Sequence, residues 1–162
     1  MAQLRHNGGG VIIMTFVAAM MLVMVPLWDW LEALRPSFVA MVLIYWTLAL
    51  PERVGVTIGW LVGLLLDVVM GVLLGVHAAA LALVAYLVIK VHQRMRQFPL
   101  WQQALSVMML IGLQQMIVLW VKGMSGQVTE SWWYWITPVT SMLLWPWVFG
   151  LLRTIRRHFH VR

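Results

Sequence analysis

The sequence contains no cysteine and carries very little charge. Without cysteine, a disulfide framework, a thiolate metal site and a cysteine nucleophile are all excluded. Charged residues make up 10% of the 162 residues and hydrophobic residues 63%, against about 25% and about 45–50% in ordinary soluble domains. A water-soluble fold of this length cannot hide so much apolar surface. The composition therefore predicts a protein whose surface faces lipid.

Recognisable catalytic motifs are also missing. The glycines at positions 8–10 are not followed by a lysine at the spacing of a phosphate-binding loop, and no HExxH zinc motif occurs. The serines and histidines form no known nucleophile arrangement. His158 and His160 could hold a metal ion, but on a basic tail we interpret them as a solvated, lipid-facing end. The sequence predicts no enzyme, no catalytic residue, no metal site and no cofactor.

Apolar segments recur along the chain. A helix needs about 20 apolar residues to cross a hydrocarbon core of about 30 Å. Residues 54–89 are too long for one crossing, and the glycine-flanked stretch 71–75 is the expected turn between two. The first segment resembles a signal peptide, but no small-residue cleavage site follows it, so we interpret it as an uncleaved helix. The sequence predicts one all-α membrane domain over residues 1–162, a bundle of six transmembrane helices at about 11–28, 37–50, 54–70, 76–90, 101–121 and 132–152.

The placement of basic residues tests this number of crossings. The formal charge of +6 is typical of nucleic-acid binding, but the basic residues lie at the ends of apolar segments, so no nucleic-acid partner is expected. With six crossings and the N-terminus inside, nine of the eleven Lys and Arg residues fall on the inner side, and only Arg35 and Lys122 lie outside. Five crossings would place the cluster at 90–96 outside. The positive-inside rule therefore predicts that both termini are cytoplasmic.

Small residues recur at every fourth position around one acidic residue. Such spacing lets helix backbones approach closely in lipid, where no hydrophobic drive brings helices together. Asp67 is the one acidic residue deep in a predicted span, and insertion scales put such a carboxylate at roughly 2.5–3.5 kcal/mol unfavourable. It therefore needs a partner or a proton. This predicted packing ridge consists of Gly55, Gly59, Gly63, Asp67, Gly71 and Gly75.

Two interpretations of Asp67 are open. The carboxylate could belong to an ion or proton relay, or it could cap the following turn or bond to a neighbouring helix. We favour the structural interpretation because no second buried acid is present to pass a proton onward. Thr137, Thr140 and Ser141 are plausible helix partners. The predicted ligand or interhelical polar contacts are Arg35, Asp67, Gln114 and Gln115.

Several short motifs occur together in one order. Arg35-Pro36 opens a short helix, Leu50-Pro51 closes it, and the glycine–aspartate ridge follows. Further along come the tryptophan-glutamine start of the fifth helix at 101–105, the 144–147 Leu-Trp-Pro-Trp run and a basic tail. Over its whole length the chain resembles the MreD family of bacterial rod shape-determining membrane proteins.

This resemblance implies a non-enzymatic scaffold in the inner (cytoplasmic) membrane, part of the elongation complex that organises peptidoglycan synthesis and maintains rod shape. The implied partners are MreC, which has a single membrane span, the actin-like MreB, a glycosyltransferase, a transpeptidase and membrane lipids. The family is also similar in fold to the substrate-binding subunits of energy-coupling-factor transporters. A vitamin-type transporter subunit or a lipid-binding protein is therefore the alternative function, with an integral enzyme as a third.

Overall fold

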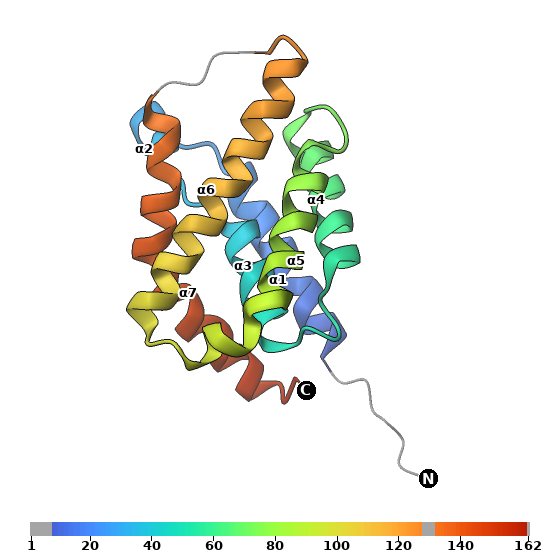
Figure 1. The fold of residues 1–162 in the computed structure, drawn as a ribbon, viewed down its shortest axis with the longest axis vertical. Helices are drawn as coiled ribbons and strands as arrows, with labels where there is room; N and C mark the ends of the chain where they lie inside the picture. Colours follow the sequence, from blue (N-terminus) through green and yellow to red (C-terminus); the bar gives the residue numbers. More distant parts are fainter. Residues whose placement is uncertain (1–7, 128–131, 162) are drawn as a thin grey trace.

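The computed structural model describes residues 8–127 and 132–161, and within them the secondary structure is helical throughout. Six helices of twelve or more residues run up and down the molecule in alternation, with the start of α1 and the end of α7 at the same end (Figure 1). The elements are α1 (Gly9–Met24), α2 (Asp29–Ala33), α3 (Phe38–Ala49), α4 (Val56–Met70), α5 (Val76–Gln97), α6 (Leu100–Met124), the 3₁₀ turn η1 (Trp132–Trp135) and α7 (Ile136–His158).

The described helices are those of a multi-pass membrane protein. Four helical segments are long and apolar enough to span a membrane: Asp29–Ala49, Val76–Gln97, Leu100–Met124 and Trp132–His158. The apolar helices α1 and α4 are shorter, with 16 and 15 residues, or about 24 and 22 Å of helix at 1.5 Å per residue. All six lie close to the six helices predicted from hydropathy.

The helix ends differ from the predicted bounds in two ways. α1 ends at Met24 rather than near 28, because Pro26 pushes the preceding residue out of the helical region. α5 and α7 run on beyond 90 and 152, to Gln97 and His158. Hydropathy marks only the apolar part of a helix, whereas basic residues in the last turn favour continuation through the helix dipole.

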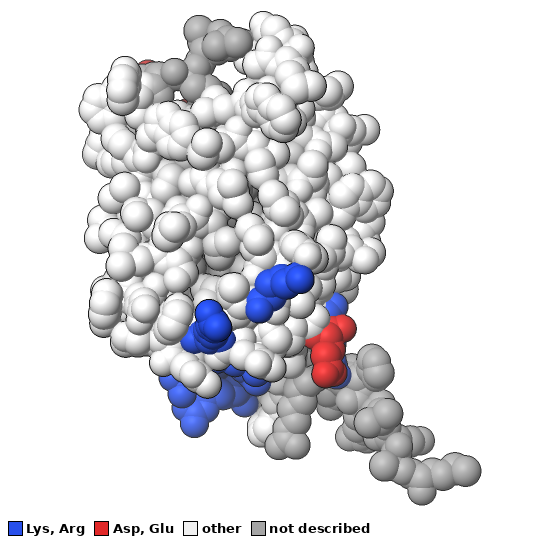
Figure 2. Space-filling model, viewed as in Figure 1, with Lys and Arg blue, Asp and Glu red and all other residues white. Residues whose placement is uncertain are grey.

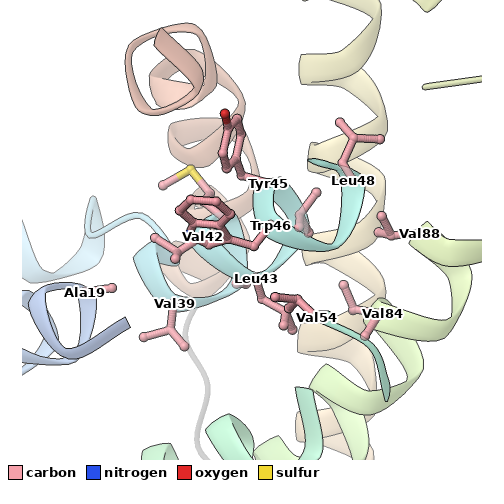
Figure 3. Close-up of a cluster of buried hydrophobic side chains, with 14 of the residues drawn as sticks. Ala19, Val39, Val42, Leu43, Tyr45, Trp46, Leu48, Val54, Val84 and Val88 are labelled. Carbon is pink, nitrogen blue, oxygen red and sulfur yellow. The ribbon is translucent and has the colours of Figure 1, made fainter. Parts of the chain in front are cut away.

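The short helix α3 forms the core of the bundle. Residues 39–48 are all buried, because α3 packs against α1, α5, α6 and α7. Figure 3 shows its side chains meeting residues from several elements, among them Ala19 and Val84. A helix that is apolar all round belongs in the interior. Trp46, which is fully buried, donates its indole N–H to the Thr15 hydroxyl of α1 at 2.9 Å.

The predicted packing ridge contains glycines that approach α5 closely. A Cβ added at Gly63 would lie 2.3 Å from the Cα of Ala78, and one at Gly59 would lie 3.0 Å from the Leu81 carbonyl oxygen. At Gly55 the nearest atom is at 3.8 Å, an ordinary contact. Gly59 and Gly63 are therefore the positions at which α4 and α5 need the absence of a side chain.

The last two glycines of the ridge form the turn instead. A Cβ at Gly71 or Gly75 would meet open space, but their φ angles are +64° and +105°, a region that costs other residues about 1–2 kcal/mol. Val72 N–H donates to the Asp67 carbonyl at 3.1 Å and Gly71 N–H to the Val68 carbonyl at 3.2 Å. This pair of bonds is a Schellman motif. The predicted packing ridge therefore has two roles. Its middle glycines allow α4 and α5 to pack closely, and its last two glycines form the turn between these helices.

Basic side chains gather at one end of the bundle. On the face shown in Figure 2, Lys and Arg lie at the end where α1 begins and α7 ends, and none is visible on the upper surface. We call this the basic end. Arg35 and Lys122 lie toward the opposite end, beyond α2 and at the last turn of α6. The described members of the basic end are Arg53, Lys90, Arg94, Arg96, Arg153, Arg156 and Arg157.

Gly63→Ala is expected to lower the stability of the folded protein. Its Cβ would collide with the backbone of Ala78, so α4 and α5 must separate, and overpacking of this kind costs about 1–3 kcal/mol. The measurement is the melting temperature of the full chain purified in detergent. Gly112→Ala in α6, where a Cβ meets open space, is the matched control and should not destabilise the fold. Equal melting temperatures for the two variants would contradict the close-packing argument.

Candidate functional site

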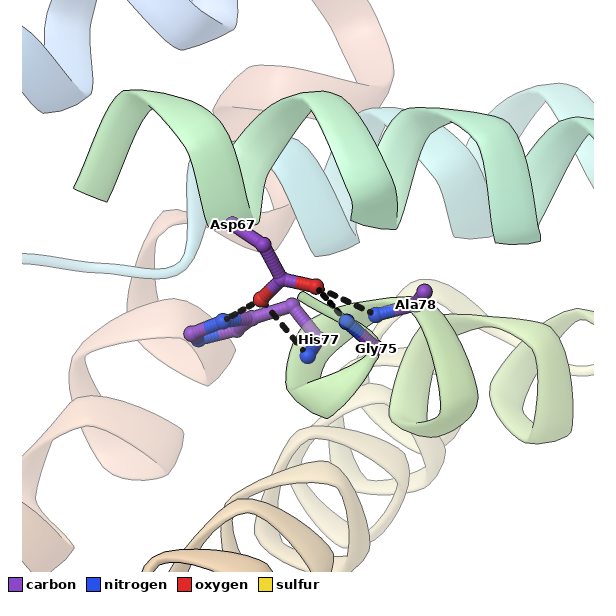
Figure 4. A network of polar contacts seen from close by, with 4 residues as sticks. All are labelled: Asp67, Gly75, His77 and Ala78. Atoms are coloured by element: carbon purple, nitrogen blue, oxygen red, sulfur yellow. Dashed lines mark hydrogen bonds and ion pairs between the residues drawn. The ribbon is translucent and has the colours of Figure 1, made fainter. Parts of the chain in front are cut away.

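The Asp67 carboxylate binds the start of the next helix (Figure 4). Its Oδ2 accepts a hydrogen bond from the Gly75 backbone N–H at 2.8 Å and a longer one, 3.4 Å, from that of Ala78. Its Oδ1 accepts from the backbone N–H of His77 at 2.9 Å. The side chain of Asp67 is fully buried. Both oxygens are therefore used at the N-terminus of α5.

This arrangement gives α5 a cap that its own sequence lacks. The first N–H groups of a helix have no partner within it, and the N-cap residue of α5 is Gly75, which has no side chain. Asp67 supplies the missing acceptor from the last turn of α4, and its negative charge lies at the positive end of the α5 dipole. These contacts are those of a helix cap, and none of them involves Gln114, Gln115 or α7.

His77 completes the polar group around Asp67. Its Nδ1 lies 2.8 Å from Asp67 Oδ1, and because the carboxylate oxygen accepts, Nδ1–H is the donor. His77 is not among the residues predicted from the sequence. The available signal was its position, two residues after the turn glycine Gly75 and inside an otherwise apolar segment. The pair links α4 to α5 through side chains as well as through the backbone.

Arg35 caps the C-terminal end of α1, as Asp67 caps the N-terminal end of α5. Its guanidinium donates to the backbone carbonyls of Val23 and Val25, in the last turn of that helix, where carbonyl groups lack partners within the helix. A cation is favourable at this negative end of the dipole. The Nε of Arg35 is buried and forms no hydrogen bond within the described residues.

A small cavity with a mostly apolar lining brings several predicted polar residues together. It has a volume of about 140 Å³, and Arg35, His77, Gln114 and Gln115 line it. Asp67 lies behind His77 and does not line the cavity. The Oε1 atoms of both glutamines are buried without a described hydrogen-bond partner. The cavity is large enough to hold water that could reach these polar atoms.

The predicted helix partners on α7 are placed differently. Thr137 lines this cavity, whereas the Thr140 hydroxyl donates to the Ile136 carbonyl of its own helix at 3.1 Å. The Ser141 hydroxyl accepts from the Ser37 backbone N–H at 3.0 Å and so links α7 to the start of α3. None of the three is hydrogen bonded to Asp67.

The chemistry available at this site is that of binding and orientation. In the part of the chain that the structure describes, no three His, Cys, Asp or Glu side chains lie close enough to hold a metal ion. His77 and Asp67 hold each other through a side-chain hydrogen bond. The site can fix helix ends and hold a few waters or a small polar group.

Comparison with known proteins decides the family. The family model described as "rod shape-determining protein MreD" matches residues 5–155. The chain belongs to the MreD family. It is similar to the rod shape-determining protein MreD of Haemophilus influenzae, with 34% identity over 142 residues that cover 88% of each chain. No solved structure matches the chain.

Membership of the MreD family agrees with the sequence predictions of class and location. The MreD family consists of non-enzymatic, shape-determining proteins of the bacterial inner membrane, and the apolar helices of this chain fit that location. The match includes five of the six long helices completely and α7 up to residue 155. The site around Asp67, His77 and Arg35 therefore belongs to a rod shape-determining membrane protein. In the hydrocarbon region, backbone N–H and C=O groups at helix ends need hydrogen-bond partners from the protein itself.

Asp67→Leu is expected to destabilise this MreD protein more than Asp67→Asn. Asparagine is a good N-cap residue but offers one acceptor oxygen instead of two, whereas leucine leaves buried N–H groups unpaired at about 1–3 kcal/mol each. Melting temperature in detergent measures both, with the exposed Asp29→Asn as the control. An Asp67→Asn protein with normal stability that fails to restore rod shape in a deletion strain would instead favour the relay or ligand interpretation.

Proposed function

We propose that this protein is a membrane scaffold of the cell-elongation complex, which binds MreC and helps to organise peptidoglycan synthesis. The actin-like MreB, a glycosyltransferase and a transpeptidase are the further members of that complex. The observation that carries the proposal is a long apolar groove between α1 and α4. A scaffold needs such a surface for a membrane partner, and it needs no reacting groups.

In this proposal all six long helices cross the membrane, and both termini lie in the cytoplasm. The alternating helix directions and the concentration of arginine and lysine at the basic end support this topology (Figures 1 and 2). α1 and α4 are shorter than the hydrocarbon core of about 30 Å. A short span is accommodated by local thinning of the bilayer or by association with another helix.

The groove between α1 and α4 has a volume of about 580 Å³. It forms because α1 packs mainly against α3 while α4 packs mainly against α5. Ile13 and Val17 line one wall, and Leu61 and Leu65 line the other. These four side chains are between 46% and 63% exposed, and each pair is spaced four residues apart, so successive helical turns present them to the same groove.

A single transmembrane helix fits this groove better than a soluble partner does. The walls are apolar along several turns, which suits a helix that also faces lipid. Charge appears at one end only, where Glu52 and Arg53 line the groove. That end is the basic end, at which charged residues flanking a partner's span would emerge from the membrane. MreC, with its one span, is the occupant that the proposal names.

The cavity beside His77 is smaller than a transporter's substrate site would be. Pockets for small molecules usually measure about 300–1,000 Å³, and this cavity measures about 140 Å³. The α1–α4 groove is large enough, but its walls offer few polar groups to orient a vitamin. The likeness to substrate-binding subunits of energy-coupling-factor transporters is therefore proposed for the helix arrangement alone.

Cysteine cross-linking tests the scaffold proposal directly, because the chain contains no cysteine of its own. Val17→Cys and Leu61→Cys place single thiols on opposite walls of the groove, and each is combined with an MreC that carries one cysteine in its membrane span. Both are expected to form disulfide-linked heterodimers in membranes after mild oxidation. Met109→Cys on α6, 72% exposed and outside the groove, is the matched control.

The pattern of cross-links decides the outcome. Linkage from the two groove positions, to neighbouring turns of the MreC span and absent from Met109→Cys, is the expected result. Linkage to MreC from Met109→Cys but from neither groove position would contradict the docking face. Complete absence of linkage, with MreC and the variant proteins both present in the membrane and rod shape maintained, would contradict MreC binding at this face as the basis of function.

A further inference from the structure

A second cavity opens at the basic end, away from Asp67. It measures about 370 Å³ and lies between the last turn of α3, the junction of α5 with α6, and the last turns of α7. Unlike the cavity beside His77, it is strongly cationic and has no carboxylate in its lining. The polar side chains around it are Tyr45, Arg96, Gln103, Arg153 and Arg156.

Arg96 is fixed in place by the end of α3. Its Nε donates to the Leu48 carbonyl at 2.8 Å and its Nη2 to the Ala49 carbonyl at 2.7 Å. These bonds satisfy two carbonyls that α3 leaves without partners. They use only some of the N–H groups of the guanidinium, which has five. The cation is therefore held rigidly beside the cavity with donors to spare.

Arg153 and Arg156 add two further cations from α7. They are three residues apart, so they share one face of the helix. Neither forms an ion pair with a described residue, and the Tyr45 hydroxyl lies beside Arg156. Three guanidinium groups around one cavity repel one another, and the low dielectric near lipid strengthens this repulsion. An anion among them relieves this repulsion.

Gln103 adds an acceptor that the described protein leaves unused. Its side chain is 4% exposed, and its Nε2 donates to the Met95 carbonyl at 2.9 Å. That bond fixes the orientation of the amide, because the nitrogen must face the carbonyl. The Oε1 atom is buried without a hydrogen-bond partner. A buried acceptor of this kind costs free energy unless a donor reaches it.

We propose that this cavity binds the headgroup of an anionic glycerophospholipid. The phosphate lies among Arg96, Arg153 and Arg156, whose planar forks match phosphate oxygens, and a headgroup hydroxyl donates to Gln103 Oε1. The apolar part of the lining, which includes Leu48 and Phe149, receives the upper acyl chains. The volume falls within the range of ligand sites, and the cavity lies at the end of the helices, where headgroups are found.

Lipid titration of the full chain tests this assignment. The protein is purified in a neutral detergent and titrated with phosphatidylglycerol, phosphatidylcholine or inorganic phosphate, with bound lipid measured by native mass spectrometry and stability by melting temperature. Phosphatidylglycerol is expected to bind and to raise the melting temperature. Phosphatidylcholine, which has no net charge and no headgroup hydroxyl, should bind at least about tenfold more weakly.

Arginine variants localise the binding. Arg153→Gln combined with Arg156→Gln should weaken phosphatidylglycerol binding about tenfold or more, whereas Arg157→Gln, on the same helix but outside the cavity, should leave it unchanged. Arg96 is left intact because it also closes α3. Equal loss in the Arg157→Gln control would overturn the site, and equal affinity for phosphatidylcholine in the unaltered protein would overturn the lipid class. Displacement of the lipid by a similar concentration of inorganic phosphate would show a free-anion site and overturn the lipid assignment.

Discussion

A backbone N–H or C=O group without a partner is costly in lipid, and every helix end leaves several such groups. The ends of α1, α3 and α5 have no polar side chain of their own to close them, since they are formed by Val25, Leu50 and Gly75. Charged side chains from other elements close them instead. Cations lie at the two C-termini and an anion at the N-terminus, as the helix dipole requires. The three capping residues are Arg35 for α1, Arg96 for α3 and Asp67 for α5.

These caps also connect the elements into one frame. Arg35 ties the segment before α3 to α1, Arg96 ties the end of α5 to α3, and Asp67 ties α4 to α5. The buried helix α3 lies at the centre, with α1, α5 and α7 packed around it. Each of these charges is held by hydrogen bonds to a helix end. The frame is therefore suited to holding surfaces in fixed positions, which is what a scaffold requires.

Much of the fold could be predicted from the sequence, because length and hydropathy determine which segments become helices in lipid. The predicted helix bounds were wrong where the side chains become polar but the helix continues, as in α5, which ends at Gln97. The site was harder to predict. The glycines at every fourth position have two different structural roles, close contact at Gly63 and a positive φ at Gly71. The spacing alone does not show which glycine has which role. His77 and the targets of Asp67 are fixed by how the α4–α5 turn folds back, which no local pattern encodes.

The charged side chains at the two ends of the bundle differ in their partners. At the end near α2, Arg35 donates its hydrogen bonds to backbone carbonyl oxygens. At the basic end, Arg153 and Arg156 have no ion pair with a described residue, and Gln103 keeps a free acceptor beside them. The net charge of +6 cannot be balanced by the chain itself. Anionic headgroups of the membrane lie at this depth and can supply the compensating charge, and the proposed lipid site uses this source.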